Sequence, residues 1–472
     1  MTDYSVMKEL TFTSRDEFTR KPIAEKILKL LDSDIDVSPL IIDGKWGTGK
    51  TEFCFKLKNL IEDNSSNNYK VGYVNAFQAD HANEPLLTLI SEIVSFYPKK
   101  SYQRKRLIKN AVPYLRLVGG IGLKAGLGFA FGRYAADIPE AFSKGMETIE
   151  EGSKELIDLS LESLIEDQAE ADRSLNTLKD ALNNIAADNP VILLIDELDR
   201  CRPDFAVMML ETIKHVFDVE NVQIILITNA EQLKATIKHS YGSGSDTDSH
   251  SYLYKFFKYQ INLPTTSKDK DNQSVENNVT YFEKVLRDSK VISQEFKDNQ
   301  FIYEVSRYVK ISDLSLRNIE QVVRCIETLI VFEGKEQSKE PIPEQILMVL
   351  LSFTYIAKKE LLEEIIKGEI QISNFASFFK YKSIDIPNGI ESLPNNHLGF
   401  FINLIFKNSL QRNIITINNI STLVHKEMLL NAFDNLHIQD EIENSRYLSN
   451  SSYLYKYIDH TINNLLLFEI VK

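Results

Sequence analysis

The 472-residue sequence predicts an α/β fold organised around a doubly wound parallel sheet. Five short apolar runs, several rich in Val and Ile, are bounded by turn or charged residues, as strands buried on both faces of a parallel sheet are. Helical patterns with apolar residues three and four apart alternate with these runs. The predicted strands are Pro39–Asp43, Lys70–Asn75, Val191–Asp196, Val222–Thr228 and Tyr259–Leu263. The predicted helices between them are Thr51–Ile61, Glu84–Tyr97 and Phe205–Phe217. In such sheets, ligands bind at the carboxyl ends of the strands.

The alternation of strands and helices covers only part of the chain. Residues 1–98 and 188–265 carry it, and we predict that they form one α/β core domain. Residues 99–187 interrupt the core as an inserted segment, which begins basic and glycine-rich and continues as an acidic helical pattern. The polar stretch Thr265–Asn278 introduces mostly helical sequence, so residues 266–472 are predicted to form a C-terminal helical domain.

Charge within the inserted segment is separated into two blocks. Ile93–Ala136 contains nine Lys or Arg residues and no acid, whereas Asp137–Asp188 contains fourteen acids and four Lys or Arg residues. The basic, glycine-rich part, Lys99–Arg133, has the composition of a segment that contacts a nucleic-acid backbone or lies on a membrane surface. It has equal reason to pack on the acidic block that follows it. The sequence leaves these roles open.

The inserted segment is interrupted by charge too often to cross a membrane. A spanning helix needs about 20 mostly apolar residues. The longest uncharged stretches here are Leu117–Leu123 and Ala125–Gly132, and Lys124 separates them. Because a charge near the bilayer centre costs on the order of 3 kcal/mol, we predict no transmembrane helix.

Cysteine and histidine usage excludes several classes of site. Cys54, Cys201 and Cys325 are far apart and lack metal-ligand spacing, which fits a reducing compartment better than a disulfide framework. Residues 1–10 have no apolar core of a secretory signal. We therefore expect a cytoplasmic protein, and the basic block leaves a peripheral position at the inner membrane as the alternative. The eight histidines are scattered, so no nuclease, protease or deaminase site is predicted.

Gly44–Thr51 has the pattern G-x-x-x-x-G-K-[ST] of a phosphate-binding loop, directly after one predicted strand and directly before a predicted helix. Glycines let such a loop wrap phosphates with its N–H groups inward, and the helix beyond adds a positive N-terminal dipole. Lys50 is expected to reach the β- and γ-phosphates, and the Thr51 hydroxyl is expected to ligate Mg²⁺. The residues predicted to bind the nucleotide in this region are Gly44, Trp46, Gly47, Thr48, Gly49, Lys50, Thr51 and Glu52.

The third predicted strand ends in two acids that complete a nucleotide site. Asp196, at the strand tip, is expected to hold Mg²⁺ through water. Glu197 is expected to accept a proton from the attacking water, which favours hydrolysis over nucleotide holding alone. We therefore assign catalytic roles to Glu197 and Lys50 and predict ATP and Mg²⁺ as ligands. ATP is preferred to GTP because the sequence has no guanine-reading Asn-Lys-x-Asp element.

Two further residues are candidates for the catalytic site. Arg200 follows the two acids closely and is placed to stabilise transition-state charge, in cis or from a neighbouring subunit. It has equal reason to pair with a nearby acid, and the acids available are Asp196, Asp199 and Asp204. Asn229 follows the fourth predicted strand and is placed to hydrogen-bond the γ-phosphate or its water, with a plain turn as the alternative.

Four sequence elements together resemble the KAP family of P-loop NTPases. They are Gly44–Thr51, Asn75-Ala76-Phe77, Asp196–Pro203 and the run Tyr252–Phe257 before Leu263-Pro264. The resemblance covers about residues 15–330, and its most specific part is the run Asp196–Cys201. Phe77 stands where the family usually has Trp. Charged residues interrupt the insertion where family members often have transmembrane helices, namely Arg116, Lys124 and Arg133.

The resemblance implies an ATPase of the additional-strand, catalytic-glutamate branch of P-loop proteins, with Glu197 as the base. It also implies that Arg317, at the start of an amphipathic helix, senses the nucleotide; a solvated or salt-bridged arginine is the alternative. Ile23 is implied to pack on the nucleotide base. Family members are linked to membrane-associated signalling in animals and to phage exclusion or anti-phage defence in bacteria.

The sequence therefore predicts an ATP-driven switch or motor in a multi-component system with partner proteins, and the resemblance favours bacterial anti-phage defence. The alternative is an adaptor that binds nucleic acid or a membrane surface and in which ATP is mainly structural. A P-loop kinase fits less well because no arginine-rich lid is visible. Whether the chain forms a homo-oligomer is left open.

Overall fold

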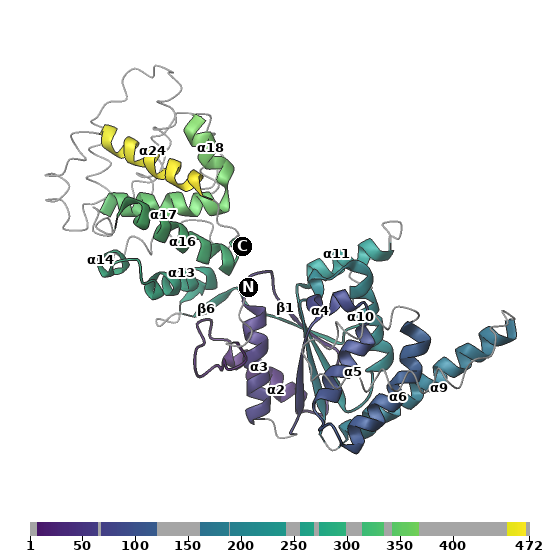
Figure 1. The fold of residues 1–472 in the computed structure, drawn as a ribbon. Helices are drawn as coiled ribbons and strands as arrows, with labels where there is room; N and C mark the ends of the chain where they lie inside the picture. Colours follow the sequence, from purple (N-terminus) through teal and green to yellow (C-terminus); the bar gives the residue numbers. More distant parts are fainter. Residues whose placement is uncertain are drawn as a thin grey trace. The chain divides into compact units, whose positions relative to one another are not determined.

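The computed structural model divides into two compact units, Met1–Pro264 (unit 1) and Thr265–Lys472 (unit 2), which Figure 1 draws as ribbons. It describes residues 7–64, 68–119, 161–187, 189–241, 255–268, 273–298, 314–334, 342–367 and 451–468. The glycine-rich stretch with Lys124 and Arg133 lies outside these residues, as does the beginning of the motif at Tyr252. No helix in the described ranges has both the length and the apolar character needed to cross a membrane.

Unit 1 is built on a five-stranded sheet in which every strand pair is parallel, so the predicted parallel α/β sheet is confirmed. Its strands are β1 (Leu40–Asp43), β2 (Lys70–Asn75), β3 (Val191–Asp196), β4 (Val222–Thr228) and β5 (Tyr259–Asn262). The spatial order is β2-β3-β4-β1-β5, so β4 lies between β1 and β3. The last residues of neighbouring strands pair in register, Asp43 with Thr228 and Asn75 with Asp196. The strand ends that carry the predicted motifs therefore meet at one end of the sheet.

Helices cover both faces of this sheet, as a doubly wound fold requires (Figure 1). Side chains alternate along each strand, so Leu40 and Ile42 enter the core on one face and Ile41 enters the core on the other. The first face is covered by α2 (Lys21–Leu31) and α3 (Lys50–Asn64). The second face is covered by α5 (Pro85–Ser95), α10 (Pro203–Val216) and α11 (Ala230–Tyr241). Because both faces are buried, the central strands are apolar at almost every position.

Two helices of the inserted segment, α6 (Tyr102–Gly119) and α9 (Leu161–Ala186), pack on each other and join the core of the second face. Their buried apolar side chains (the packed seam) include Leu107, Ala111 and Leu115 from α6 and Leu178, Leu182 and Ile185 from α9. Lys105 and Lys109 of the basic block remain exposed. Arg104 is buried, which removes it from the basic surface expected from the sequence.

Unit 2 begins with a short antiparallel hairpin and continues as helices around one apolar core. The hairpin joins β6 (Thr266–Lys268) to β7 (Ser274–Glu276), within the polar stretch that the sequence marked only as the start of a helical region. The described helices are α13 (Asn277–Asp288), α14 (Gln294–Asp298), α16 (Leu316–Glu333), α17 (Ile342–Ala357), α18 (Lys359–Lys367) and α24 (Ser451–Leu467). Ser315 and Asn318 exchange side-chain-to-backbone hydrogen bonds and so fix the start of α16.

Gly72 lies in β2, where neighbouring side chains leave no room for a Cβ atom. A Cβ atom at this position would stand 2.6 Å from Glu92 Cγ and 2.9 Å from Leu193 Cδ2. We therefore expect Gly72→Ala to lower the free energy of unfolding of unit 1 by about 1–3 kcal/mol through overpacking. Urea unfolding followed by the fluorescence of Trp46, the sole tryptophan of the chain, measures this change. An unchanged unfolding midpoint would contradict the close packing of α5 on β2.

Candidate functional site

The phosphate-binding loop predicted at Gly44–Thr51 runs from the end of β1 into the first turn of α3. Gly47 and Gly49 have φ angles of +71° and +79°, in a region that residues with a Cβ atom avoid. Gly44 is required for a different reason, because a Cβ atom there would stand 2.9 Å from Thr48 Oγ1. The loop thus folds tightly over a helix start, where backbone N–H groups without helical partners favour an anion.

The ammonium group of Lys50 is folded onto this loop. Its Nζ donates hydrogen bonds to the carbonyl oxygen of Gly44 at 2.7 Å and to that of Lys45 at 3.1 Å. Burial lowers the pKa of Lys50, and the negative charges of Asp199 and Asp196 oppose this lowering. The Lys50 ammonium is therefore close enough to interact with Asp196, which ends β3, and with Asp199, which follows it.

Asp196 joins the end of β3 to the start of α3. Its Oδ2 accepts a hydrogen bond from Thr51 Oγ1 at 2.7 Å and a longer one from the Tyr73 hydroxyl at 3.3 Å. Its Oδ1 accepts the backbone N–H of Glu197 at 2.8 Å. The residue is only 1% exposed, and this burial raises the pKa of Asp196 to about 6 although the Thr51 hydrogen bond lowers it. The two residues predicted to hold Mg²⁺ are thus in direct contact.

Glu197 directly follows and is 8% exposed. Its φ of +63° lies in the left-handed region, which is strained for a residue with a long side chain and is found most often at functional sites. Both carboxylate oxygens are bound: Asn75 Nδ2 donates to Oε2 at 3.0 Å, and Arg200 Nη1 lies 3.1 Å from Oε1. Within the described part of the chain, Arg200 therefore pairs with the candidate base and not with one of the three aspartates considered from the sequence.

Asn75 is a site residue that the sequence analysis did not single out for a role. It ends β2, and its side-chain oxygen also accepts the backbone N–H of Gln78 at 3.0 Å, so it caps the short helix α4 (Ala76–Ala79). The pairing of β2 with β3 sets Asn75 beside Asp196. The sequence signal for Asn75 was its position as a polar residue at the end of a predicted strand. The sequence could not show that it contacts Glu197, because this depends on β2 lying next to β3 in the sheet.

Asp199 was also not assigned to the site from the sequence. It is buried in the 3₁₀-helix η3 (Leu198–Arg200). Its Oδ1 accepts a hydrogen bond from Thr228 Oγ1 at 3.0 Å, and its Oδ2 accepts one from the indole N–H of Trp46. Asp199 therefore connects the phosphate loop with the end of β4.

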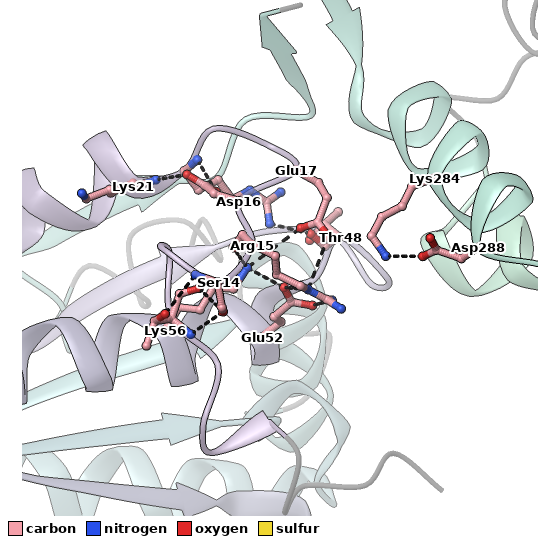
Figure 2. A network of polar contacts seen from close by, with 12 residues as sticks. Ser14, Arg15, Asp16, Glu17, Lys21, Thr48, Glu52, Lys56, Lys284 and Asp288 are labelled. Carbon is pink, nitrogen blue, oxygen red and sulfur yellow. Dashed lines mark hydrogen bonds and ion pairs between the residues drawn. The ribbon is translucent and has the colours of Figure 1, made fainter.

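Two predicted nucleotide-site residues use their side chains for other contacts. The Glu52 carboxylate binds Arg15 and Lys56, with Lys56 Nζ at 2.7 Å, and so faces the N-terminal segment (Figure 2). Asn229 Oδ1 accepts the backbone N–H of Gln232 at 3.3 Å, at the first turn of α11. For both residues, a contact with the nucleotide stays a prediction.

The remaining predicted residues lie on two helices. Arg317 is exposed at the second position of α16, in unit 2, and its role toward the nucleotide stays a prediction. Ile23 is half-buried in the first turn of α2 and packs against the apolar core of the first sheet face. Its proposed contact with the base likewise stays a prediction.

The fold and this site define the chain as a P-loop protein of the α/β class. A phosphate-binding loop with two glycines at positive φ leads into a helix at the carboxyl end of a parallel sheet. Thr51, in the first turn of this helix, contacts the buried Asp196 at the end of β3. A sequence model of the KAP family P-loop domain matches residues 20–334, more than half of the chain, and the chain therefore belongs to the KAP family. The resemblance inferred from the motifs is thus confirmed. No curated protein matches the chain. Family membership supports nucleotide binding and hydrolysis in general.

The donor set beside the loop fits a magnesium ion. Mg²⁺ prefers hard oxygen ligands and takes only one or two from the protein when a nucleotide supplies others. The Thr51 hydroxyl and the Asp196 carboxylate offer such oxygens, and the glycine at position 44 keeps the adjacent loop compact. These residues would hold the ion next to the phosphates.

Asp196→Asn is expected to raise the melting temperature of the ligand-free protein at pH 8, because the buried carboxylate resists ionisation. The folded pKa of about 6 lies above the ordinary value of 3.8, so the wild-type protein carries this penalty in full above about pH 6. The advantage of the variant should shrink as the pH falls from 6 toward 3.8. Thermal melts at several pH values test this, and a lower melting temperature for the variant at pH 8 would contradict it.

Proposed function

We propose that the chain is an ATPase that binds Mg-ATP with Lys50, Thr51 and Asp196 and hydrolyses it with Glu197 as the base. We further propose that it acts as a nucleotide-driven switch in a multi-component system, with bacterial anti-phage defence as the setting. The second part rests on what the resemblance to the KAP family implies.

One contact carries the proposal: the 2.7 Å hydrogen bond between Thr51 Oγ1 and Asp196 Oδ2. It brings the phosphate loop and the β3 acids to one point, where a magnesium ion and the terminal phosphates would be held together. The strand order supports the additional-strand type of P-loop protein, because β4 separates β1 from β3. The glutamate immediately after Asp196 supports the catalytic-glutamate assignment.

In the proposed reaction, Glu197 acts on a water molecule at the end of β3. As the water oxygen attacks the γ-phosphorus, the Glu197 carboxylate takes its proton, and the bond to the β–γ bridging oxygen breaks with its electron pair leaving on ADP. Lys50 offsets the negative charge of the phosphates, and a bound magnesium ion would supply further charge neutralisation. Arg200, 3.1 Å from the base, is proposed to stabilise the charge that develops on the transferred group.

Before reaction, the base is held by two neighbours. Asn75 and Arg200 occupy both carboxylate oxygens of Glu197, which fixes the side chain. A change in these contacts on nucleotide or partner binding would free one oxygen for water. This supports a switch with slow basal turnover rather than a rapid enzyme.

Glu197→Gln should bind ATP with wild-type affinity within about threefold and lose at least about 100-fold in turnover, because the amide cannot accept the proton. Lys50→Ala is the companion variant and should lose binding itself. Phosphate release and equilibrium binding of radiolabelled ATP measure the two effects separately. Wild-type hydrolysis by the Glu197→Gln protein would remove Glu197 as the base, and tight binding by Lys50→Ala would remove the loop as the nucleotide site.

The partner system can be sought with the same Glu197→Gln protein. Held with ATP bound, it should retain partners that recognise the nucleotide-bound form. Recovery of the same partners by Lys50→Ala would show that their binding is independent of ATP and would count against a nucleotide-driven switch.

The adaptor function remains the second candidate, and the exposed side of α6 favours it. Tyr102 is 72% exposed there, and Lys100, Lys105 and Lys109 are exposed around it. An aromatic ring among lysines suits both a nucleic-acid backbone and an anionic lipid surface.

Combined replacement of Lys100, Lys105 and Lys109 by Glu separates the two functions. For the switch we expect the ATPase rate to remain within about twofold of wild type, because these side chains point away from the packed seam. Turnover is measured alone, with duplex DNA and with anionic vesicles. Stimulation of the wild-type protein by either polyanion, lost in the variant, would favour the adaptor. Arg104 is left unchanged because its burial would add a folding defect.

A further inference from the structure

A second cation, Arg20, is buried behind the phosphate loop. It directly precedes α2 and is only 4% exposed. Its backbone N–H donates to Asp16 Oδ1 at 2.8 Å. The backbone N–H of Lys21 donates to Asp16 Oδ2 at 2.9 Å (Figure 2), and the two bonds fix the chain at this point. The preceding residue, Thr19, has a left-handed φ of +51°. The backbone is thus held in a costly conformation that sends the Arg20 side chain inward.

The guanidinium group of Arg20 joins two distant parts of unit 1. Nη1 donates a hydrogen bond to the carbonyl oxygen of Thr48 at 2.8 Å, and Nη2 donates a longer one to that of Pro264 at 3.4 Å. The group lies over the ring of Phe18, with 4.8 Å between its central carbon and the ring centroid. Its Nε is buried and makes no hydrogen bond with the described residues.

Burial of this charge has a cost that packing does not explain. Desolvation lowers the pKa of Arg20 to about 10, although the charges of Glu52 and Asp16 oppose this, so the group stays protonated at neutral pH. Its side-chain hydrogen-bond partners among the described residues are neutral carbonyl oxygens, not carboxylates. An uncharged side chain at this position would not carry the desolvation cost of a buried charge. The contact of Arg20 with the phosphate loop, at the Thr48 carbonyl oxygen, supplies a functional reason for the arginine.

We propose that Arg20 is a positioning residue of the phosphate loop, which orients the peptide between Thr48 and Gly49 for phosphate binding. A trans peptide is planar, and its C=O and N–H groups point in opposite directions. Holding the Thr48 carbonyl on the guanidinium therefore turns the Gly49 N–H to the opposite side of the peptide, away from Arg20. This inference rests on the proposed function, because it assigns how the same loop binds phosphate.

The guanidinium is better suited to this role than other cations. Its fixed fork reaches Thr48 and Pro264 from one planar group, whereas a lysine ammonium is a single point on a flexible stem. Arg20 also places a positive charge next to the loop. Gly49, at φ of +79°, has the conformational freedom to be rotated in this way.

Arg20→Met tests the proposal, since methionine keeps much of the side-chain volume and removes the charge and the donors. The variant is made in the Glu197→Gln protein and titrated with Mg-ATP and with inorganic tripolyphosphate, with Trp46 fluorescence as the signal. We expect the Kd of both ligands to rise by about tenfold or more, because both depend on the oriented N–H. The ligand-free variant should remain folded, with a melting temperature lowered only modestly by the loss of two hydrogen bonds to carbonyl oxygens. Arg20→Lys should recover only part of the lost affinity.

Arg15→Met is the matched control. This arginine lies in the same N-terminal segment but binds the side chain of Glu52, not the backbone of the loop, so each Kd should change less than twofold (Figure 2). An unchanged Kd in Arg20→Met, or an equal loss in Arg15→Met, would overturn the inference. So would a loss of affinity for ATP without a loss for tripolyphosphate, since Arg20 would then act on the nucleoside. If the wild-type protein binds neither ligand, the proposed function itself fails.

Discussion

The hydrogen bond between the Thr51 hydroxyl and the Asp196 carboxylate is the contact on which the rest of the site depends. It requires that α3 begin at the end of the phosphate loop and that β3 end at the aspartate. It also requires β4 to pair with both β1 and β3 so that their carboxyl ends are level. The helices on the two faces bury those strands, and this burial is what keeps the two motifs, far apart in sequence, at hydrogen-bond distance.

The same burial concentrates charge in a poorly hydrated region. Asp196 and Asp199 are almost fully covered, and the Lys50 ammonium is turned back onto carbonyl oxygens of its own loop. Without a ligand, this arrangement costs free energy, as the raised pKa of Asp196 indicates. Under the proposed function, the phosphates would meet the charge of Lys50 and a metal ion would meet that of Asp196. The site is therefore less stable by itself than the fold around it, which is common for sites organised in advance for a charged ligand.

Much of the fold was predictable because its signals are local. Strands β1 to β4 are largely buried and mostly apolar, and the pattern of Gly44–Thr51 is specific to a phosphate-binding loop. The expectation of burial was wrong for β5, because this strand lies at the sheet edge and is mostly exposed. The contacts of Asn75, Asp199 and Arg20 were not predictable, because each partner is set by strand order or by a loop folding back over a long sequence separation. The acid that pairs with Arg200 was missed for a local reason: the 3₁₀-helix η3 brings Arg200 next to Glu197, three residues before it. The β6–β7 hairpin was missed because its strands are only three residues each and polar.

The contact of Arg20 with Pro264 places the phosphate loop and the last residue of unit 1 on one guanidinium group. Unit 2 begins at the next residue, Thr265. A displacement of the chain at Pro264 would therefore act on the Arg20 guanidinium, which also binds the phosphate loop. Thermodynamic linkage makes any such coupling reciprocal: if a nucleotide alters how tightly unit 2 holds a partner, the partner alters nucleotide affinity by the same factor. A protein built in this way can report a partner's arrival through its nucleotide occupancy as readily as it can report its nucleotide to a partner.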